Sequence, residues 1–382
     1  MQSRATSRSG KRSAGAVVDA GAAPIERVEV TAYVIPTDRP EADGTFTWDR
    51  TTLVVAHVHG GGATGLGYTY ADRSAAIVAS EALAAAVVGI DGMDVPAAWA
   101  AMHRAVRNAG RPGIASTAIA AMDSALWDLK ARLLDVPLAT LLGASRQEVP
   151  VYGSGGFSSY PVDVLERQLA GWVEAGIRRV KMKVGRDAAA DTVRVRAART
   201  AIGEAAELFV DANGAWDAAR ALAMARQFAS SHVAWFEEPV SSDDLDGLRR
   251  VRDRAPEGME IAAGEYGYDI WYFRRMLEHG AVDVLQADAT RCGMTGFLQV
   301  ATLCDAFAVP LSAHTAPSLH VAPCCAASRV RHVEYFHDHA RIEQMLFDGA
   351  PLPRNGCLRP DRSRPGLGLE LKRADAAPYR VL

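Results

Sequence analysis

Hydrophobic residues follow two different rhythms along the chain, and the change between them falls near residue 149. Beyond that point, short apolar runs alternate with longer segments in which apolar residues recur every three or four positions, as at 162–176 and 218–230. This alternation predicts a parallel α/β barrel, with a doubly wound open sheet as the structural alternative. No G-x-G-x-x-G follows a first strand, which weakens the open-sheet alternative. Eight runs are expected to be strands: 149–153, 179–183, 207–211, 233–237, 260–265, 282–288, 309–314 and 332–336.

The preceding part of the chain, residues 25–146, places strands first and helices afterwards. This order predicts an α+β domain. Its expected strands are 27–35, 51–60 and 65–70, and its expected helices are 72–88, 94–108 and 114–134. The polar segment 36–49 contains Gly and Pro and is long enough to be a mobile loop between the first two strands.

Composition narrows the class of protein. The 382 residues carry a formal net charge of −3 and form no basic stripe, so a nucleic-acid partner is not expected. No apolar run approaches the roughly 18 residues of a membrane span. Residues 1–24 are basic and rich in Ser, Gly and Ala, without the apolar core of a signal peptide, and we expect a disordered tail there. The five cysteines lack metal-ligand spacing and are interpreted as reduced core thiols of a cytoplasmic protein.

A titratable side chain stands at or just after the end of seven of the predicted barrel strands. Successive members are 20 to 28 residues apart, about one strand–helix unit each. Because the carboxyl ends of barrel strands form one rim, where barrel enzymes hold their active sites, these side chains should meet there. The seven residues are Lys183, Asp211, Glu237, Glu265, Asp288, His314 and Glu334.

Three carboxylates on consecutive strands, Asp211, Glu237 and Glu265, are candidate metal ligands. Carboxylates that converge on a partly buried point repel one another unless a cation lies between them. An all-oxygen ligand set favours a hard divalent ion, Mg²⁺ first and Mn²⁺ second. The alternative is a set of helix caps and surface ion pairs, with Asp211 of D-A-N-G serving only as a turn residue.

The rim also offers two candidate proton-transfer groups. Lys181 and Lys183 alternate with Met182 on one strand, so both ammonium groups should face the carboxylates. A bound dication and the neighbouring ammonium would disfavour protonation of Lys183, which could then act as a general base. On the far side, Asp288 could fix the tautomer of His314. Taken singly, a K-x-K pair is typical of an exposed strand face, and a lone histidine is usually structural.

Together these segments resemble the enolase superfamily, specifically its mandelate racemase-like subgroup, over nearly the whole chain. The resemblance rests on V-K-M-K-V-G at 180–185, V-D-A-N-G-A-W at 210–216, W-F-E-E-P at 235–239, A-G-E at 263–265, the segment 286–296, S-A-H-T at 312–315 and V-E-Y-F at 333–336. It implies a (β/α)7β TIM-like barrel (147–350), an N-terminal α+β capping domain (25–146) and a C-terminal segment (351–382) that returns to the capping domain.

The resemblance also implies roles for individual residues. One Mg²⁺ would be held by Asp211, Glu237 and Glu265, without an organic cofactor. Lys183 would serve one face of the substrate, and His314, oriented by Asp288, the other. The remaining implied site residues are Lys181 near the substrate carboxylate, Glu334 as a hydrogen-bond donor to the developing oxyanion, and Ser154 and Asn213 as substrate contacts.

The implied chemistry is Mg²⁺-dependent removal of the proton α to a carboxylate. Acid/base groups on both faces permit either β-elimination of water from a sugar acid, which the resemblance favours, or racemisation or epimerisation of an α-hydroxy acid. A barrel that binds metal without catalysis is an alternative from another class, but it predicts a broken rim position and none is broken. The expected partner is a small carboxylate substrate, and the family's habit suggests a homo-oligomer. One departure from the family is Gly293-Met294 in place of Gly-Gly.

Overall fold

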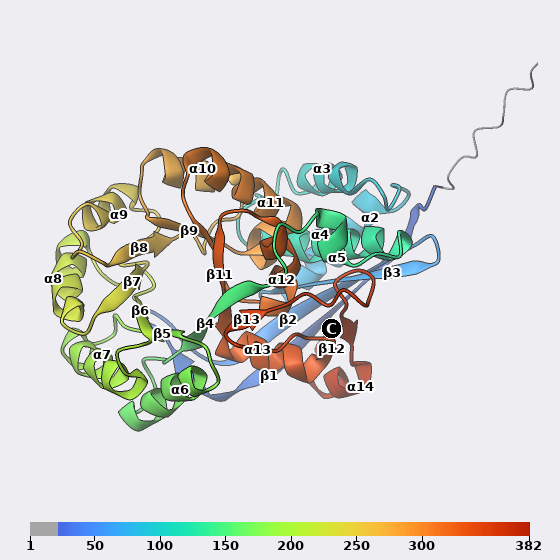
Figure 1. Cartoon of the computed structure of the whole chain (residues 1–382). Helices are drawn as coiled ribbons and strands as arrows, with labels where there is room; N and C mark the ends of the chain where they lie inside the picture. Colours follow the sequence, from blue (N-terminus) through green and yellow to red (C-terminus); the bar gives the residue numbers. More distant parts are fainter. Residues whose placement is uncertain (1–21) are drawn as a thin grey trace, which may run out of the picture.

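The computed structural model describes residues 22–382, so most of the expected tail at 1–24 lies outside the described residues. The described chain has two parts (Figure 1). A ring of strands surrounded by helices lies on the left of that view, and a sheet with its own helices lies on the right. Each part forms its own cluster of buried apolar side chains, although the larger cluster also draws in residues of the first sheet.

The barrel predicted from the strand–helix alternation is confirmed. Its eight strands are all parallel to their neighbours, and the last, β11, pairs with the first, β4, so the sheet closes and the open-sheet alternative is wrong. The strands are β4 (Val149–Gly155), β5 (Arg179–Lys183), β6 (Glu207–Asp211), β7 (Val233–Glu237), β8 (Glu260–Ala263), β9 (Val284–Ala287), β10 (Leu311–Ala313) and β11 (Val330–Phe336).

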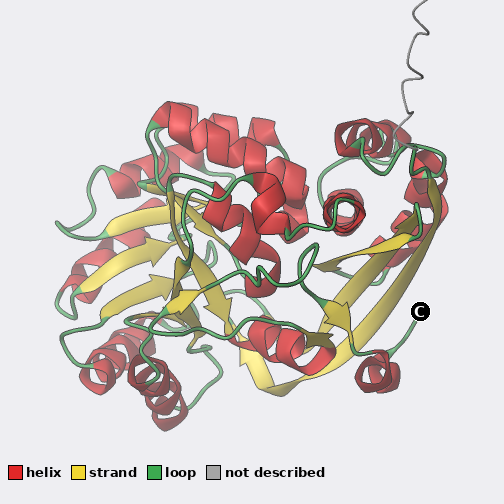
Figure 2. Cartoon of the chain, turned by 45° about the vertical axis from the view of Figure 1, so that its right-hand side comes forward, coloured by secondary structure: helices red, strands yellow, loops and turns green. Residues whose placement is uncertain are grey.

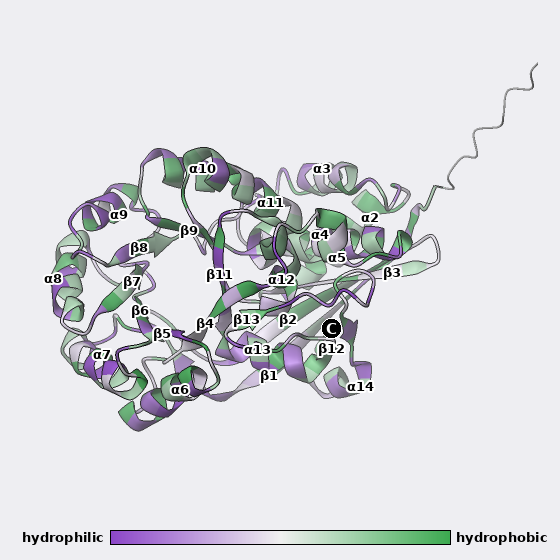
Figure 3. Ribbon diagram, viewed as in Figure 1, coloured by the Kyte–Doolittle hydropathy of each residue, from purple (hydrophilic) through white to green (hydrophobic). Residues whose placement is uncertain are grey.

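Seven helices connect these strands and cover the outside of the barrel, which gives the (β/α)7β order. In Figure 3 most of them mix hydrophilic and hydrophobic residues, as expected of helices with one face on the strands and one in water, whereas α12 is buried almost throughout. They are α6 (Val162–Glu174), α7 (Ala188–Ile202), α8 (Ala218–Ala229), α9 (Leu245–Arg252), α10 (Ile270–Glu278), α11 (Ala289–Phe307) and α12 (Pro317–Ala326).

Period-two alternation along the strands builds the inside of the barrel in layers. A buried apolar layer is formed by Tyr152, Phe209, Trp235, Ala262 and Val284. Two residues further along a strand, the side chain points the same way but lies at the rim. The packed layer thus closes the barrel from below and turns the rim into the floor of a site.

The capping domain combines an antiparallel sheet with helices, and Figure 2 shows the long, bent strands of that sheet beside the barrel. Gly65 and Gly67 of β3 allow α4 to approach, because an added Cβ would lie 2.1 Å from the carbonyl oxygen of Ala125 and 2.2 Å from that of Ala121. The elements are β1 (Ile25–Ala42), β2 (Thr47–Gly60), β3 (Ala63–Tyr70), α1 (Ser74–Ile77), the π-helical turn η1 (Val78–Leu83), α2 (Ala84–Val87), α3 (Val95–Ala105), α4 (Ile114–Leu133) and α5 (Leu138–Leu142).

The expectation of a mobile loop at 36–49 is wrong. Strand β1 runs on to Ala42 and β2 begins at Thr47, with Glu41 opposite Trp48 in the register. The strands pair through backbone groups, so polar side chains do not prevent the ladder, and composition alone was a poor guide here. The turn also rests on the barrel, since the hydroxyl of Ser158 donates to the carbonyl oxygen of Asp43 at 2.6 Å.

Helix α11 contains a kink. Gly293 interrupts α11 with φ +75°, and a Cβ there would lie 2.7 Å from the Trp99 ring. The neighbouring Met294 is helical and buried, so the replaced second glycine leaves this backbone intact.

No helix among residues 22–382 is long and apolar enough to cross a membrane. All five cysteines are free, and four of them are buried.

The chain after β11 crosses from the barrel to the capping domain. It contains α13 (His337–Leu346), β12 (Phe347–Asp348), β13 (Cys357–Leu358), β14 (Glu370–Leu371), α14 (Arg373–Ala376) and η2 (Ala377–Tyr379). Near its end the amide of Val381 donates to the carbonyl oxygen of Ala32 at 2.8 Å. The C-terminal segment therefore reaches β1.

The buried carboxylate of Asp128 on α4 joins three segments. It accepts hydrogen bonds from the amide of Leu66 on β3 at 2.7 Å, from the amide of Leu367 at 2.5 Å and from Arg132 Nε at 2.7 Å. Each donor would lose its partner if the carboxylate were removed, and buried unpaired donors are costly. Asp128 therefore holds the C-terminal segment against the capping domain.

Asp128→Ala should lower the free energy of unfolding by about 3 kcal/mol, because two amides and a partly buried guanidinium lose one shared, buried acceptor. Chemical denaturation followed by circular dichroism measures this. The matched control is Asp163→Ala, which removes an exposed carboxylate paired with Arg167 and should change stability by less than about 0.5 kcal/mol. Equal effects of the two substitutions would contradict the proposed role of Asp128.

Candidate active site

The three predicted metal ligands converge at the rim of the barrel. Asp211 ends β6, Glu237 ends β7, and Glu265 follows β8. One carboxylate oxygen from each lies within 4.8 Å of the others, and the three side chains are only 0%, 0% and 3% exposed. Their strands are direct neighbours in the barrel, which is why the phase of the sequence pattern could place them together.

The charges of these carboxylates are not balanced within the trio. Burial and the neighbouring Asp211 raise the pKa of Glu237 to about 8. Such a rise measures the cost of a buried negative charge next to another one. A hard dication between the oxygens would remove that cost, and carboxylate oxygens are its preferred ligands. The residues present therefore fit the predicted divalent metal site.

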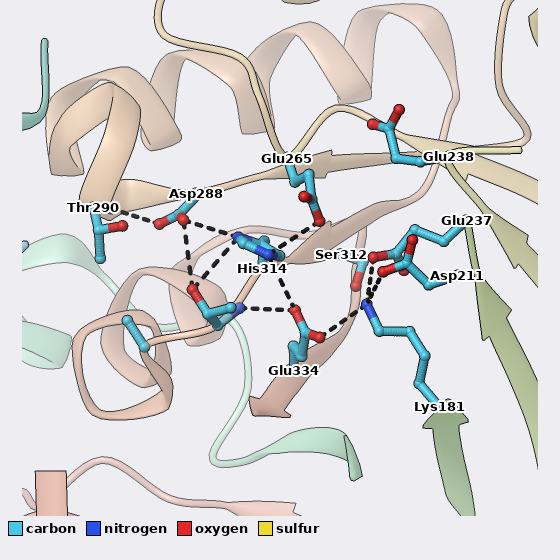
Figure 4. Close-up of polar contacts among 12 residues, drawn as sticks. Lys181, Asp211, Glu237, Glu238, Glu265, Asp288, Thr290, Ser312, His314 and Glu334 are labelled. Carbon is cyan, nitrogen blue, oxygen red and sulfur yellow. Dashed lines mark hydrogen bonds and ion pairs between the residues drawn. The ribbon is translucent and has the colours of Figure 1, made fainter. Parts of the chain in front are cut away.

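Both lysines of β5 face this cluster, as the alternation predicted. Lys183 Nζ donates to Asp211 Oδ2 at 2.5 Å. Figure 4 shows Lys181, whose Nζ binds Glu237 and lies 2.8 Å from Glu334 Oε1. Burial lowers the pKa of each ammonium group, but the facing carboxylates outweigh burial and hold both values above the ordinary range. The lowered pKa expected for Lys183 thus depends on a dication that neutralises the carboxylates, and it stays a prediction.

The predicted pair of Asp288 and His314 also forms. His314 Nδ1 lies 2.9 Å from Asp288 Oδ2, and its Nε2 lies 3.1 Å from Glu265 Oε2 on the metal side (Figure 4). Burial lowers the pKa of the imidazole, but Glu265, Glu334 and Asp288 outweigh it and raise the value to about 10. The surrounding carboxylates thus favour the imidazolium, the state of a proton donor, and a dication bound to Glu265 would weaken one of their contributions.

Glu334 lies between the two halves of the site. Its Oε2 accepts from the amide of Thr315 at 3.1 Å and lies 3.6 Å from His314 Nε2. Burial raises its pKa, but Lys181 and His314 prevail and lower the value to about 2. The role implied for Glu334, donation to an oxyanion, needs a protonated carboxyl group, and this charge environment opposes it.

The two predicted substrate-contact residues lie at the same rim. Ser154 stands beside Lys181 in the register of β4 and β5, and its buried hydroxyl has no hydrogen-bond partner among the described residues. Asn213 has φ +46° and donates from its backbone amide to Asp211 Oδ1 at 2.9 Å. Its side-chain oxygen is also buried without a partner in the described chain. Both side chains thus retain polar atoms free for a ligand.

Three further polar residues of the site escaped the sequence analysis. Trp235 Nε1 donates to Glu237 Oε2 at 2.9 Å and so orients a candidate ligand. Tyr152 places its ring 5.3 Å from Lys181 Nζ. Gln286 has both side-chain polar atoms buried and without partners in the described part of the chain. Each precedes a rim position by two residues, so the period of the strand could have revealed all three.

Comparison with known protein families covers both parts of the chain. Residues 27–143 match the N-terminal domain of the mandelate racemase/muconate lactonizing enzyme family. Residues 164–376 match the family described as enolase C-terminal domain-like.

Individual relatives agree with this match. The chain is 34% identical over 358 residues to the 3,6-anhydro-alpha-L-galactonate cycloisomerase of Streptomyces coelicolor, spanning 91% of this chain and 98% of that protein. A solved mandelate racemase/muconate lactonizing enzyme-like protein from Rubrobacter xylanophilus is 54% identical, with a TM-score of 0.92, and the match covers 94% of this chain and 100% of that one.

A third similar structure was solved with ligands. It is the L-talarate dehydratase of Polaromonas sp. JS666 in complex with Mg and L-glucarate, at 32% identity and a TM-score of 0.85, over 94% of this chain and 98% of that one. The sequence matches thus extend across the capping domain, the barrel and the rim that carries the charged residues. The chain therefore belongs to the enolase superfamily, in its mandelate racemase/muconate lactonizing enzyme family.

Proposed function

We propose that the protein is a Mg²⁺-dependent sugar-acid dehydratase. The observation that carries this proposal is a pair of proton-transfer groups on opposite walls of one carboxylate cluster. Lys183 comes from β5 and His314 follows β10. In the barrel, β11 and β4 separate these two strands on one side and β6 to β9 on the other. A substrate between the two walls would have one titratable group on each face.

The metal would be held by Asp211, Glu237 and Glu265, which the structure brings within 4.8 Å of one another. When bound, the dication withdraws electron density from the substrate carboxylate and so acidifies the α-proton. The same all-oxygen set would accept Mn²⁺. A cytoplasmic homo-oligomer without an organic cofactor remains our expectation.

The protein's own residues would divide the proton transfers between them. Lys183, once neutral, removes the α-proton, while Lys181 binds the substrate carboxylate. The raised pKa of His314 favours a protonated imidazole, which can donate a proton to the departing β-oxygen. Asp288 holds the ring in position for that donation.

Similarity to the L-talarate dehydratase structure with Mg and L-glucarate supports both the metal and the class of substrate. A second candidate follows from similarity to the cycloisomerase of a 3,6-anhydro sugar acid. In such a substrate C3, the carbon β to the carboxylate, carries an ether oxygen, so the leaving group would stay attached to the product. Racemisation, which returns the proton on the other face, is the remaining alternative.

A screen of mono- and diacid sugars in D₂O with Mg²⁺ tests the function. A dehydratase should form a 2-keto product and wash the α-proton into the solvent. Exchange accompanied by an epimer but no 2-keto product would favour the racemase alternative. Silence across the panel, with both metal binding and folding intact, would favour a barrel that binds without catalysis.

His314→Asn should lower the rate of dehydration by about a hundredfold to ten-thousandfold, since the general acid is lost. Exchange of the α-proton at the Lys183 face should persist, which a misfolded protein could not show. Proton NMR in D₂O measures both rates in one sample. The control is His232→Asn, at an exposed residue with φ +50°, where asparagine is well tolerated. Wild-type dehydration in His314→Asn would show that the assignment is wrong.

The affinity for Mg²⁺ should fall by about tenfold per pH unit below pH 8, because the ion must displace a proton from Glu237, whose pKa is raised to about 8. Well above pH 8 that carboxyl group is already ionised, so its contribution to the pH dependence should vanish and only the proton lost by Lys183 should remain. Calorimetry in buffers of different ionisation enthalpy measures the released proton. Glu237→Gln should bind Mg²⁺ at least about tenfold more weakly and lose the share of the proton release that comes from Glu237. An unchanged affinity in that variant would count against Glu237 as a ligand.

A further inference from the structure

A second group of metal-ligating side chains lies outside the rim, where the end of β1 meets the barrel. Asp38 and Glu41 come from β1, and His337 is the first residue of α13. One carboxylate oxygen of each acid and one ring nitrogen of the histidine lie within 4.8 Å of one another. Neither the proposed reaction nor the rim cluster uses these residues.

The spacing of the donor atoms suits a single ion. His337 Nε2 lies 3.0 Å from Asp38 Oδ2. Two ligand atoms about 2.0–2.1 Å from a zinc ion are about 3.3 Å apart at the tetrahedral angle. The remaining pairs lie within 4.8 Å, so they would close by at most about 1.5 Å, which small side-chain rotations can supply.

Glu41 is the second, independent observation. Its side chain is 0% exposed, and its Oε1 is buried with no hydrogen-bond partner in the described chain. Its other oxygen, Oε2, accepts from Trp48 Nε1 at 2.8 Å, which fixes the orientation of the carboxylate. A buried carboxylate oxygen without a donor is rare in a folded protein and requires a proton, a water molecule or a cation.

The charges around Glu41 favour a cation. Glu41 is buried, and the carboxylates of Asp338 and Asp38 lie near it. The nearest guanidinium, that of Arg341, is already engaged by Asp338 Oδ1 at 2.5 Å and by the carbonyl oxygen of Pro36 at 2.7 Å. Negative charge at this point is therefore in excess.

Aromatic rings line one side of the cluster. The ring of Trp48 packs edge-on against Phe157 at 5.6 Å, and Phe157 packs edge-on against His337 at 6.5 Å. Exclusion of water on that side strengthens the attraction between a dication and its ligands. The cluster thus combines a buried, fixed carboxylate with an accessible histidine–aspartate pair beside an aromatic wall.

We propose that Asp38, Glu41 and His337 form a second metal site that takes a borderline divalent ion of the Zn²⁺ class. The imidazole nitrogen distinguishes it from the all-oxygen rim cluster, because imidazole suits Zn²⁺ whereas Mg²⁺ prefers oxygen. An ion held there would join β1 of the capping domain to α13 of the barrel. His337 follows Glu334 by three residues, so the ion would hold the hairpin of β1 and β2 beside the mouth of the active site.

Equilibrium dialysis of the full chain against Zn²⁺, with saturating Mg²⁺ to occupy the rim, tests this site. The wild type should retain one Zn²⁺ per chain, measured by elemental analysis, and its melting temperature should rise with Zn²⁺. His337→Asn and Asp38→Asn should each weaken this binding at least about tenfold. Both positions are partly exposed, so the variants should fold.

Two controls separate this site from other binding. His279→Asn changes an exposed histidine outside the cluster and should keep the ion. Glu237→Gln alters the rim and should also keep it, which distinguishes failure of this proposal from failure of the proposed catalytic metal site. Absence of bound Zn²⁺ in the wild type, or equal Zn²⁺ binding by the wild type and His337→Asn, would overturn the proposal. Glu41 would then be a protonated acid in a hydrogen-bonded contact.

Discussion

Repulsion among buried carboxylates at the barrel rim is the interaction on which the site depends. The closed sheet fixes the ends of neighbouring strands next to one another, so Asp211, Glu237 and Glu265 cannot move apart without opening the barrel. Buried like charges persist only where cations compensate them. Lys181 and Lys183 supply part of that compensation in the structure, and a dication would supply the rest.

This arrangement divides the site into halves of different chemistry. On the β5 side, the ammonium groups of Lys181 and Lys183 pair with the candidate ligand carboxylates. A dication that neutralised these carboxylates would lower the pKa of Lys183 and so favour its neutral form. On the β10 side, Asp288 and Glu265 hold His314 as an imidazolium. A metal-activated base and an acid that its neighbours keep protonated suit β-elimination, because one group removes the α-proton and the other protonates the departing oxygen.

The hairpin of β1 and β2 is held rigidly against the barrel. Its strands extend over the barrel and are anchored there through Ser158, so the residues beside the mouth come from paired backbone instead of a free loop. The cluster of Asp38, Glu41 and His337 lies at this junction. A cation bound there would restrain the capping domain from a point outside the reaction centre. Its ligands would include an imidazole nitrogen, whereas the rim cluster offers only carboxylate oxygens.

The sequence by itself determined the barrel, the phase of its strands and the seven charged residues of the rim, because side-chain alternation is local and parallel strands end at one edge. It missed Trp235, which orients Glu237, and the unpartnered Gln286, both of which lie one layer below in that same period. The pairing of 36–49 and the contact of Asp38 with His337, 299 residues apart, were decided only by the tertiary structure. Polar segments carry no periodic signal for their partners, and the burial that raises the pKa of Glu41 exists only once the capping domain packs on the barrel.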